Sequence, residues 1–448
     1  MEDVNIKSKI IIFCLILCLI FSITSVSASD VNTTDNQVLS ATPNIDTLSA
    51  SVNTEQNNNT QSVSENNLLS AGSDSGSNDL LGADEETGTF SDLDKLIGLS
   101  SGTLTLNQNY KYNPDTDSNY QSTGIVLSKS IIINGRGFSI SGNGITSAFT
   151  VNADNVILEN MNIINTYGRS AVYWDANNGK MDNLNFTNTS YLEGTGGALY
   201  VYYSDGIIVN NTIFNNSQAK VSGALASAGS QVEVYNSKFV QCKILGDDSY
   251  WGAAMSIDVQ SSPALLVNCT FDQCDSSQAH YATSASAANS GILYAQRNSY
   301  TLINCTFRNN KVVFSASSYG MLAEMNMLNM TGCILEENSG QGIMKVDVLY
   351  MDSCIIENQT DVTNFFNRQK PSYMNIQNCN FTNSKFTNLF NLNNGVSSIL
   401  NNILFENITV TNLIQTSVDF ITISNSVFNN INVSSSAPIY LNSNYNTI

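Results

Sequence analysis

Residues 302–310 read LINCTFRNN, and near-copies of this stretch recur through the C-terminal part of the chain. Three of them are LVNCTFDQC at 266–274, IQNCNFTNS at 376–384 and ISNSVFNNI at 423–431. Aligned on Phe307, the chain holds eleven copies, whose anchor residues are Ile163, Phe186, Phe214, Phe239, Phe271, Phe307, Leu335, Ile356, Phe381, Phe405 and Phe428. The anchors lie 21 to 36 residues apart. A repeat of this length is typical of a solenoid, in which each unit buries its apolar face against its neighbours.

The position three residues before the anchor predicts a bend between two strands. The residues five and two before the anchor are apolar or small, although strand alternation gives these two positions opposite parity. The alternation therefore breaks between them, where Asn, a residue that tolerates left-handed backbone, stands in nine copies. We expect the side chains to form a hydrogen-bonded structural ladder of Asn160, Asn183, Asn211, Asn236, Asn268, Asn304, Asn378, Asn402 and Asn425.

A further strand, opened by glycine and small apolar residues, precedes most copies, as in Gly196-Gly197-Ala198-Leu199 and Gly223-Ala224-Leu225. Only 12% of the residues are charged and no unit contains a helix-forming stretch, which argues against helical and leucine-rich solenoids. The sequence therefore predicts an all-β parallel β-helix with three strands per turn and about 11–13 turns.

The N-terminal part is predicted to lie outside this solenoid. Residues 1–28 have the Lys7 and Lys9 charges, an apolar run and the small residues of a cleaved secretory signal peptide, and we expect no membrane span after cleavage. Residues 29–89 are acidic and rich in Asn, Ser and Thr, which is typical of a disordered linker. The solenoid domain is expected at 90–448, with Ser91 and Gly98 bounding a short capping helix.

Two groups of motifs resemble known families. Gly196-Gly197-Ala198-Leu199 and Phe307-Arg308-Asn309-Asn310 resemble the two short repeats of chlamydial polymorphic outer-membrane proteins. The segment from about 90 to 165, with Ile133-Asn134-Gly135, is similar to the adhesin-like surface proteins of methanogenic archaea. That resemblance implies a right-handed parallel β-helix of the pectin-lyase type, a secreted or cell-surface location and a role in adhesion.

Seven cysteines follow the signal peptide. Five of them occupy the same repeat position in consecutive turns, namely Cys269, Cys305, Cys333, Cys354 and Cys379. A turn spacing of about 4.8 Å would permit disulfides. However, seven is an odd number and a ladder has no unique pairing, so buried free thiols are the favoured interpretation. No metal site and no cofactor are predicted.

An enzyme on this fold needs paired carboxylates, and Asp247-Asp248 is the best candidate. It resembles the paired aspartates of polygalacturonases, but the other motifs of that family are absent and His280 has no flanking glycine. Asp182 and Asp352 share a repeat position but lie several turns apart. We therefore predict a protein that is not an enzyme.

The irregular loops around 247–281 are the predicted glycan-binding site. Tyr250, Trp251 and Tyr281 offer ring faces for sugars, with Asp247 and Asp248 as polar partners. Packing of Trp251 beneath its own loop is the alternative. The net charge of −19 excludes nucleic acid as a favoured partner.

The predicted function is therefore that of a surface protein whose loops bind glycans or other cells. A polysaccharide lyase or glycoside hydrolase is the first alternative, and a structural cell-wall component is the second. The last turn has no cap at Ile448, so we expect either a truncated sequence or end-to-end self-association.

Overall fold

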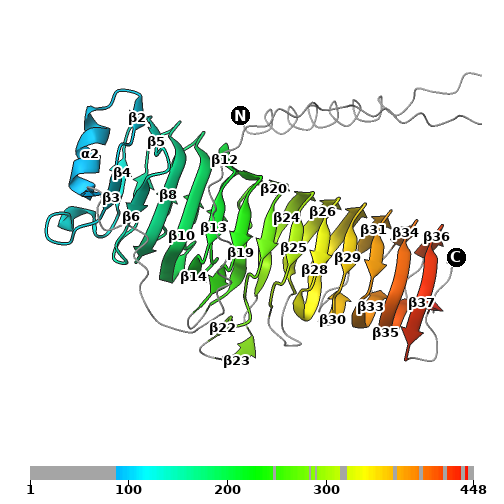
Figure 1. The fold of residues 1–448 in the computed structure, drawn as a ribbon. Coiled ribbons are helices and arrows are strands. Elements are labelled where there is room, and N and C mark those ends of the chain that lie inside the picture. The colour runs from blue at the N-terminus through cyan, green and yellow to red at the C-terminus, as the bar shows by residue number, and fades with distance from the viewer. Residues whose placement is uncertain are drawn as a thin grey trace, which may run out of the picture. The chain divides into compact units, whose positions relative to one another are not determined.

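A computed structural model shows a parallel β-solenoid of about 13 turns, preceded by a short helix (Figure 1). It describes residues 87–245, 249–281, 284–287, 290–312, 320–366, 371–392, 397–416, 421–434 and 439–441. The predicted signal peptide and nearly all of the predicted linker lie outside these residues. Among the described residues, no helix is long and apolar enough to cross a membrane.

Most of the strands lie on three faces along the solenoid. The anchor face contains the anchor residues and comprises β1 (Thr87–Gly88), β3 (Asn109–Lys111), β6 (Ser139–Ser141), β13 (Ile213–Asn215), β17 (Lys238–Val240), β21 (Thr270–Asp272), β25 (Thr306–Arg308), β27 (Ile334–Glu336), β29 (Ile355–Glu357), β32 (Asn380–Thr382) and β37 (Val427–Val433). The bend face precedes the Asn bend and comprises β2 (Thr103–Thr105), β5 (Ile132–Asn134), β12 (Ile207–Asn210), β16 (Val232–Tyr235), β20 (Ala264–Val267), β31 (Tyr373–Gln377), β34 (Ser397–Asn401) and β36 (Ile421–Ser424).

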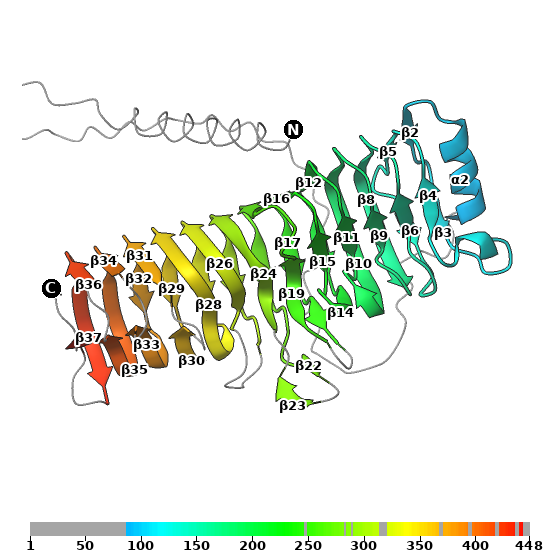
Figure 2. The same ribbon diagram turned by 180° about the vertical axis from the view of Figure 1, so that it is seen from behind.

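The glycine face follows the glycine-rich openings of the turns. It comprises β4 (Ile125–Leu127), β7 (Phe149–Val151), β9 (Val172–Trp174), β11 (Leu199–Tyr202), β15 (Leu225–Ala228), β19 (Trp251–Ile257), β30 (Asp361–Phe366), β33 (Lys385–Leu392) and β38 (Ile439–Leu441). Several strands run continuously across corners, namely β8 (Ile157–Tyr167), β10 (Lys180–Thr195), β24 (Ser290–Ile303), β26 (Leu322–Thr331), β28 (Ser339–Asp352) and β35 (Leu404–Thr416). Figure 2 shows β9, β11, β15 and β19 side by side.

The bend predicted from Asn is left-handed in all eleven aligned copies of the repeat. The nine predicted Asn residues, together with Gly332 and Ser353 at the same position, have φ between 49° and 62°. A second left-handed residue stands two after each anchor, with φ between 48° and 55°. This second bend divides the chain once more, so that one turn contains four strand segments, β11, β12, β13 and β14 (Gln218–Val221), where the sequence predicts three.

The core is a set of columns that run through the turns. The rings of Phe186, Phe214, Phe239, Phe271 and Phe307 stack at centroid distances of 5.2, 4.6, 4.9 and 4.6 Å. The strand register adds two turns to the eleven aligned copies of the repeat. Tyr110 pairs with Ile140, and Ile140 pairs with the first anchor, Ile163. Both residues are buried, but Thr105 stands five residues before Tyr110 and Gly137 three residues before Ile140, where the aligned copies have an apolar residue and mostly Asn.

The capping helix differs from the prediction in its ends. Helix α2 (Phe90–Leu99) is capped by Thr89, whose hydroxyl accepts from the Asp92 N–H at 3.1 Å, and Gly98 lies inside it. The predicted cap, Ser91, instead donates its hydroxyl to Asp117 at 2.6 Å. Since Thr87 and Gly88 pair with β3, the solenoid begins before residue 90.

Two minor elements complete the description. A short 3-10 helix, η1 (Ser118–Tyr120), follows Asp117, and a two-residue strand, β18 (Lys243–Ile244), pairs with β14. The strands β22 (His280–Tyr281) and β23 (Ser284–Ala287) form an antiparallel hairpin, which projects from the solenoid in both ribbon views.

Candidate binding surface

Tyr250 and Trp251, the predicted sugar-binding residues, lie together and pack against the solenoid. The Trp251 ring stacks on Tyr294 at 5.7 Å and meets Tyr250 edge-on at 5.6 Å. Tyr250 also packs against the core, and Tyr294 is buried, with its hydroxyl donating to Glu324 at 2.7 Å. Trp251 starts β19, as the packing alternative expects, with a left-handed φ of 77°.

The other predicted binding residues are Asp247, Asp248 and Tyr281. Asp247 and Asp248 lie outside the described residues. Tyr281 is described only by its backbone, in β22. The geometry of a paired-aspartate site therefore remains a prediction.

A larger aromatic cluster lies on the glycine face and was not predicted. It consists of Tyr173 on β9, Tyr200 and Tyr202 on β11, and Tyr203 directly after β11. Tyr173 lies 5.6 Å from Tyr200 and 6.1 Å from Tyr202, and Tyr202 lies 4.6 Å from Tyr203. We call these four residues the tyrosine platform. Arg169 covers its first ring, with the guanidinium carbon 4.1 Å from the centre of Tyr173.

Tyr203 is held in an unusual position at the exposed end of the platform. Its φ of 46° is left-handed, a conformation that costs a bulky residue free energy and is often found at functional sites. A Cβ on Gly229 in the next turn would lie 2.6 Å from the Tyr203 ring, so the ring lies across a residue that must be glycine. The Tyr203 hydroxyl donates to Gln260 at 2.7 Å, a further turn along. These contacts fix a ring that is 56% exposed.

The platform and the Trp251 group belong to the same face. Strand register connects Tyr200 through Ala226 and Ser256 to Tyr294. Burial, followed by the neighbouring phenols and Asp258, raises the pKa of Tyr200 to about 12. Its hydroxyl, which is uncharged at neutral pH even at the ordinary pKa of tyrosine, therefore stays protonated in alkaline solution as well. A repeated tyrosine between glycine-led strands is the sequence signal that could have revealed this cluster.

The bend ladder exists but does not run through one column of side chains. Asn183 donates to Asn160 at 2.8 Å, Asn268 to Asn236 at 3.1 Å and Asn402 to Asn378 at 2.8 Å. Other members donate to the residue just before the bend in the adjacent turn: Asn211 to Asp182, Asn236 to Asn210, Asn378 to Asp352 and Asn425 to Asn401. Gly332 and Ser353 follow Asn304 and interrupt the amides.

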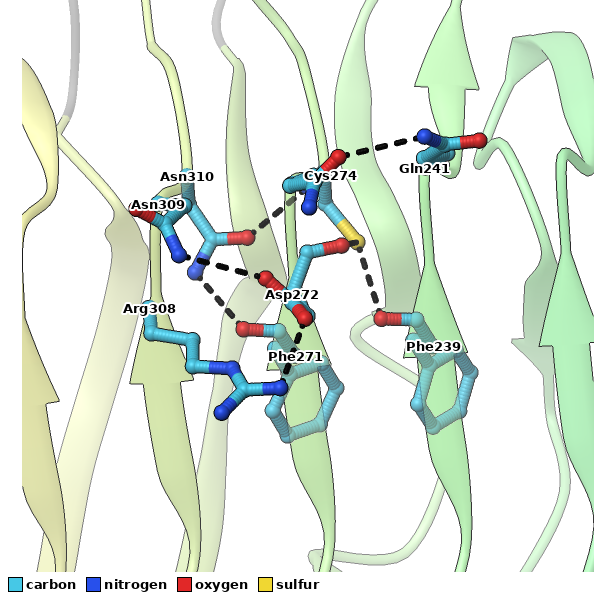
Figure 3. A network of polar contacts seen from close by, with 9 residues as sticks. Phe239, Gln241, Phe271, Asp272, Cys274, Arg308, Asn309 and Asn310 are labelled. Atoms are coloured by element: carbon cyan, nitrogen blue, oxygen red, sulfur yellow. Dashed lines mark hydrogen bonds and ion pairs between the residues drawn. The ribbon is translucent and has the colours of Figure 1, made fainter. Parts of the chain in front are cut away.

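A second amide column, inside the core, was missed. Asn310, Asn338 and Gln359 stand three residues after successive anchors and are buried; we call them the core amide column. Asn310 donates to the Phe271 carbonyl at 2.9 Å and to Asn338 at 3.0 Å, and accepts from the Cys274 N–H at 2.9 Å. Figure 3 shows Asn310 of this column beside the ion pair of Arg308 and Asp272, whose charged atoms are 2.8 Å apart. Each contact joins one turn to the next, so the network is structural.

All seven described cysteines are buried free thiols. Cys305 donates to the Leu266 carbonyl at 3.4 Å, and Cys333 to that of Leu302 at 3.5 Å. The neighbouring thiol of Cys269 and burial raise the pKa of Cys305 to about 12, which keeps it protonated. The described residues contain no group of three or more His, Cys, Asp or Glu side chains that could hold a metal ion.

Comparison with known proteins identifies the family. The family described as right-handed β-helix region matches residues 123–290 and 170–360, which together span more than half of the chain. The chain therefore belongs to the right-handed β-helix family. No curated protein matches the sequence.

Solved structures with some similarity include three carbohydrate-related proteins. A mannuronic acid-specific polysaccharide family 6 lyase from human gut microbiota has 10% identity over 78% of this chain and 82% of its own, with a TM-score of 0.34. The tailspike of E. coli bacteriophage HK620 has 9% identity, coverages of 75% and 74%, and a TM-score of 0.36. The catalytic domain of a GH87 α-1,3-glucanase has 11% identity, coverages of 82% and 68%, and a TM-score of 0.32. These values are too low to transfer an activity.

Proposed function

We propose that this chain is a secreted or cell-surface β-helical protein that binds carbohydrate through the tyrosine platform without catalysing a reaction. The observation that carries the proposal is the Tyr203 ring, which is exposed yet fixed by its backbone, by Gly229 and by Gln260. A ring that is already in place loses little conformational entropy on binding. Its face can cover the apolar side of a sugar ring.

The polar surroundings of the platform favour a neutral glycan. The rings provide phenol hydroxyls, which are uncharged at neutral pH. The net charge of −19 opposes binding of polyanionic glycans. The adhesion expected from the family resemblance would then consist of glycan binding by a rigid solenoid.

A glycan array with matched variants tests this proposal. Tyr203→Ala together with Tyr202→Ala should weaken binding by about tenfold or more, because each aromatic contact contributes on the order of 1 kcal/mol beyond its buried area. Gly229→Ala should act similarly, since its new Cβ would displace the Tyr203 ring. Tyr440→Ala, an exposed tyrosine on β38, is the control and should bind normally.

Three outcomes would contradict the proposal. Full binding by the Tyr202/Tyr203 double variant would exclude the platform. Release of reducing or unsaturated ends from bound polysaccharide would favour the lyase or hydrolase alternative. Retention of no glycan by the folded wild-type protein would favour a structural wall component.

A further inference from the structure

Two turns of the bend face have an aspartate at the same repeat position but differ in the residue beside it. Asp182 has Lys180 two residues earlier, and the Lys180 ammonium lies 2.8 Å from its carboxylate. Asp352 has Tyr350 at the place of the lysine. Strand register from β10 through β12, β16, β20, β24 and β26 to β28 aligns Lys180 with Tyr350. In the described part of the chain, no Lys or Arg pairs with Asp352.

A hollow of about 280 Å³ lies beside Asp352, lined among others by Tyr350, Asn375, Gln377 and Thr331. The Tyr350 ring is 40% exposed, and its centre is 5.4 Å from that of Tyr373. The Asp352 carboxylate accepts from the Asn378 amide at 2.8 Å and from the Ser353 hydroxyl at 3.0 Å. The hollow therefore combines a fixed carboxylate with an aromatic wall.

Asn375 supplies a further acceptor to this hollow. Its side-chain oxygen is buried and has no hydrogen-bond partner. In the turn of Lys180 the corresponding neighbour is the apolar Ile208, whereas Tyr350 pairs with Asn375. A buried carbonyl oxygen without a donor is unfavourable, so a small shift of the Asn375 side chain that brings this oxygen to a donor in the hollow would relieve a cost already present in the protein.

The chemistry of these three groups matches a protonated amine. An ammonium group has three donors and no acceptor, and it is attracted by a carboxylate and by an aromatic face. No cationic side chain lines the described hollow, and the net charge of −19 draws cations toward the protein. We propose that Tyr350, Asp352 and Asn375 bind a primary ammonium group, carried by a lysine side chain or by a free alkylamine, at the place that Lys180 fills in its own turn.

Calorimetric titration with small probes tests the ligand. Nα-acetyl-lysine methylamide and n-butylamine carry the ammonium group, while the Nε-acetylated lysine derivative and n-butanol are neutral counterparts. Binding of both cations without their counterparts would assign a general alkylammonium site, and binding of the lysine derivative alone would assign a lysine side chain. Equal binding of charged and neutral probes, or no binding of either cation at millimolar concentration, would overturn the proposal.

Variants of the chain test the site. Tyr350→Lys copies the Lys180 and Asp182 arrangement, so it should fold normally and fill the site with its own ammonium, abolishing probe binding. Asp352→Asn should weaken binding by about tenfold or more, because it removes a charge-assisted hydrogen bond. Asn375→Ile, which introduces the residue found at Ile399 in the next turn, should weaken binding less.

Failure here is distinguishable from failure of the glycan proposal. Tyr202→Ala on the glycine face should leave amine binding unchanged, and Tyr350→Lys should leave glycan binding unchanged. Unchanged amine binding by a folded Tyr350→Lys variant, checked by its melting temperature, would exclude the site.

Discussion

Two columns of side-chain amides run along this solenoid, one in solvent and one in the core. The bend ladder stands at left-handed residues on the surface, whereas the core amide column of Asn310, Asn338 and Gln359 is buried. Both join adjacent turns by hydrogen bonds at similar distances, as in Asn268 to Asn236 at 3.1 Å and Asn310 to Asn338 at 3.0 Å. The same chemical group therefore serves two environments.

The difference lies in what can replace each amide. In the bend ladder the chain itself substitutes Gly332 and Ser353, whose φ values of 62° and 55° preserve the bend while water can satisfy the exposed groups. In the core, a missing amide leaves its partners without water. In most other turns a hydroxyl or a thiol takes this place, as where the Gln359 N–H donates to Ser384, and the last two copies have Ile408 and Ile431 there. We infer that the amides on the surface matter mainly because they tolerate the left-handed backbone, whereas those in the core matter mainly because of their hydrogen bonds.

The largest effect is expected from removing an amide of the core. Asn338→Ala leaves the Phe307 carbonyl and the Asn310 N–H without the partners that lie 3.0 and 3.1 Å away, so it should lower the free energy of unfolding by about 3–5 kcal/mol. Urea unfolding would measure the loss. Asn338→Cys is the matched control, because Cys274 occupies this position in an earlier turn, and it should cost less. Equal losses in both variants would mean that volume, not hydrogen bonding, decides.

A buried carboxylate at the N-terminal end extends the comparison to charge. Asp117 accepts from the N–H groups of Phe90, Ser91 and Asn113 at 2.8–3.0 Å, at the start of helix α2. Burial alone would raise its pKa, but these hydrogen bonds and that of the Ser91 hydroxyl outweigh burial and lower it. We expect Asp117→Ala to destabilise the cap by about 3 kcal/mol at neutral pH.

The lowered pKa of Asp117 also sets the sign of the pH dependence. Because the folded-state pKa lies below the unfolded value, the stabilisation is present above about pH 4 and is lost as the pH falls through the folded-state pKa. Melting temperatures measured from pH 6 down to pH 2.5 should fall for the wild type, and the decrease should be smaller for Asp117→Asn. A parallel decrease in both proteins would assign the acid sensitivity to other carboxylates.

The sequence was sufficient to predict the solenoid because its signals are local and repeated. A period of 21 to 36 residues and an Asn at each bend require no knowledge of distant contacts. The first two turns lie outside the eleven aligned copies because Thr105 stands five residues before Tyr110, where the copies have an apolar residue, and Gly137 stands three residues before Ile140, where most have Asn. Similarly, Ser91 was mistaken for the helix cap because its actual partner, Asp117, is 26 residues away in sequence.

The candidate surface was harder to predict, since it depends on registration between turns. Trp251 and Tyr250 are predicted to bind sugars because they are aromatic residues beside aspartates. In the structure, Trp251 stacks on Tyr294, which is 43 residues further along the chain. To predict the tyrosine platform, one would have to infer that Tyr173 and Tyr200, which are 27 residues apart in sequence, lie together on one face. That spacing becomes visible only when the glycine-led strands are aligned separately from the anchors.

A smaller effect is expected at the surface bend. In Asn268→Ala, alanine must adopt the left-handed φ of 54°, which it tolerates less well than asparagine. The variant should therefore lower the free energy of unfolding by about 1 kcal/mol. Asn268→Gly is the control and should be nearly neutral, as Gly332 fills this position in another turn. Urea unfolding of both variants shows whether Asn268 stabilises the bend through its tolerance of a left-handed backbone or through its side-chain hydrogen bond. If Gly cost as much as Ala, the hydrogen bond to Asn236 would be the main contribution, and the distinction between the two columns would fail.

The smallest effect is expected where a charged pair stands on the surface. Burial would raise the pKa of Asp182, but hydrogen bonds from Lys180, Asn211 and Asn210 outweigh burial and lower it. The Asn bonds remain in Lys180→Met, and the lysine side chain is 41% exposed, so this variant should lose at most about 0.5 kcal/mol. Since salt screens exposed charges, the difference should vanish in 1 M NaCl. Because methionine retains the apolar stem, a loss that persists in salt would mean that the 2.8 Å contact acts as a hydrogen bond shielded from solvent, and the pair would then not be an exposed surface pair.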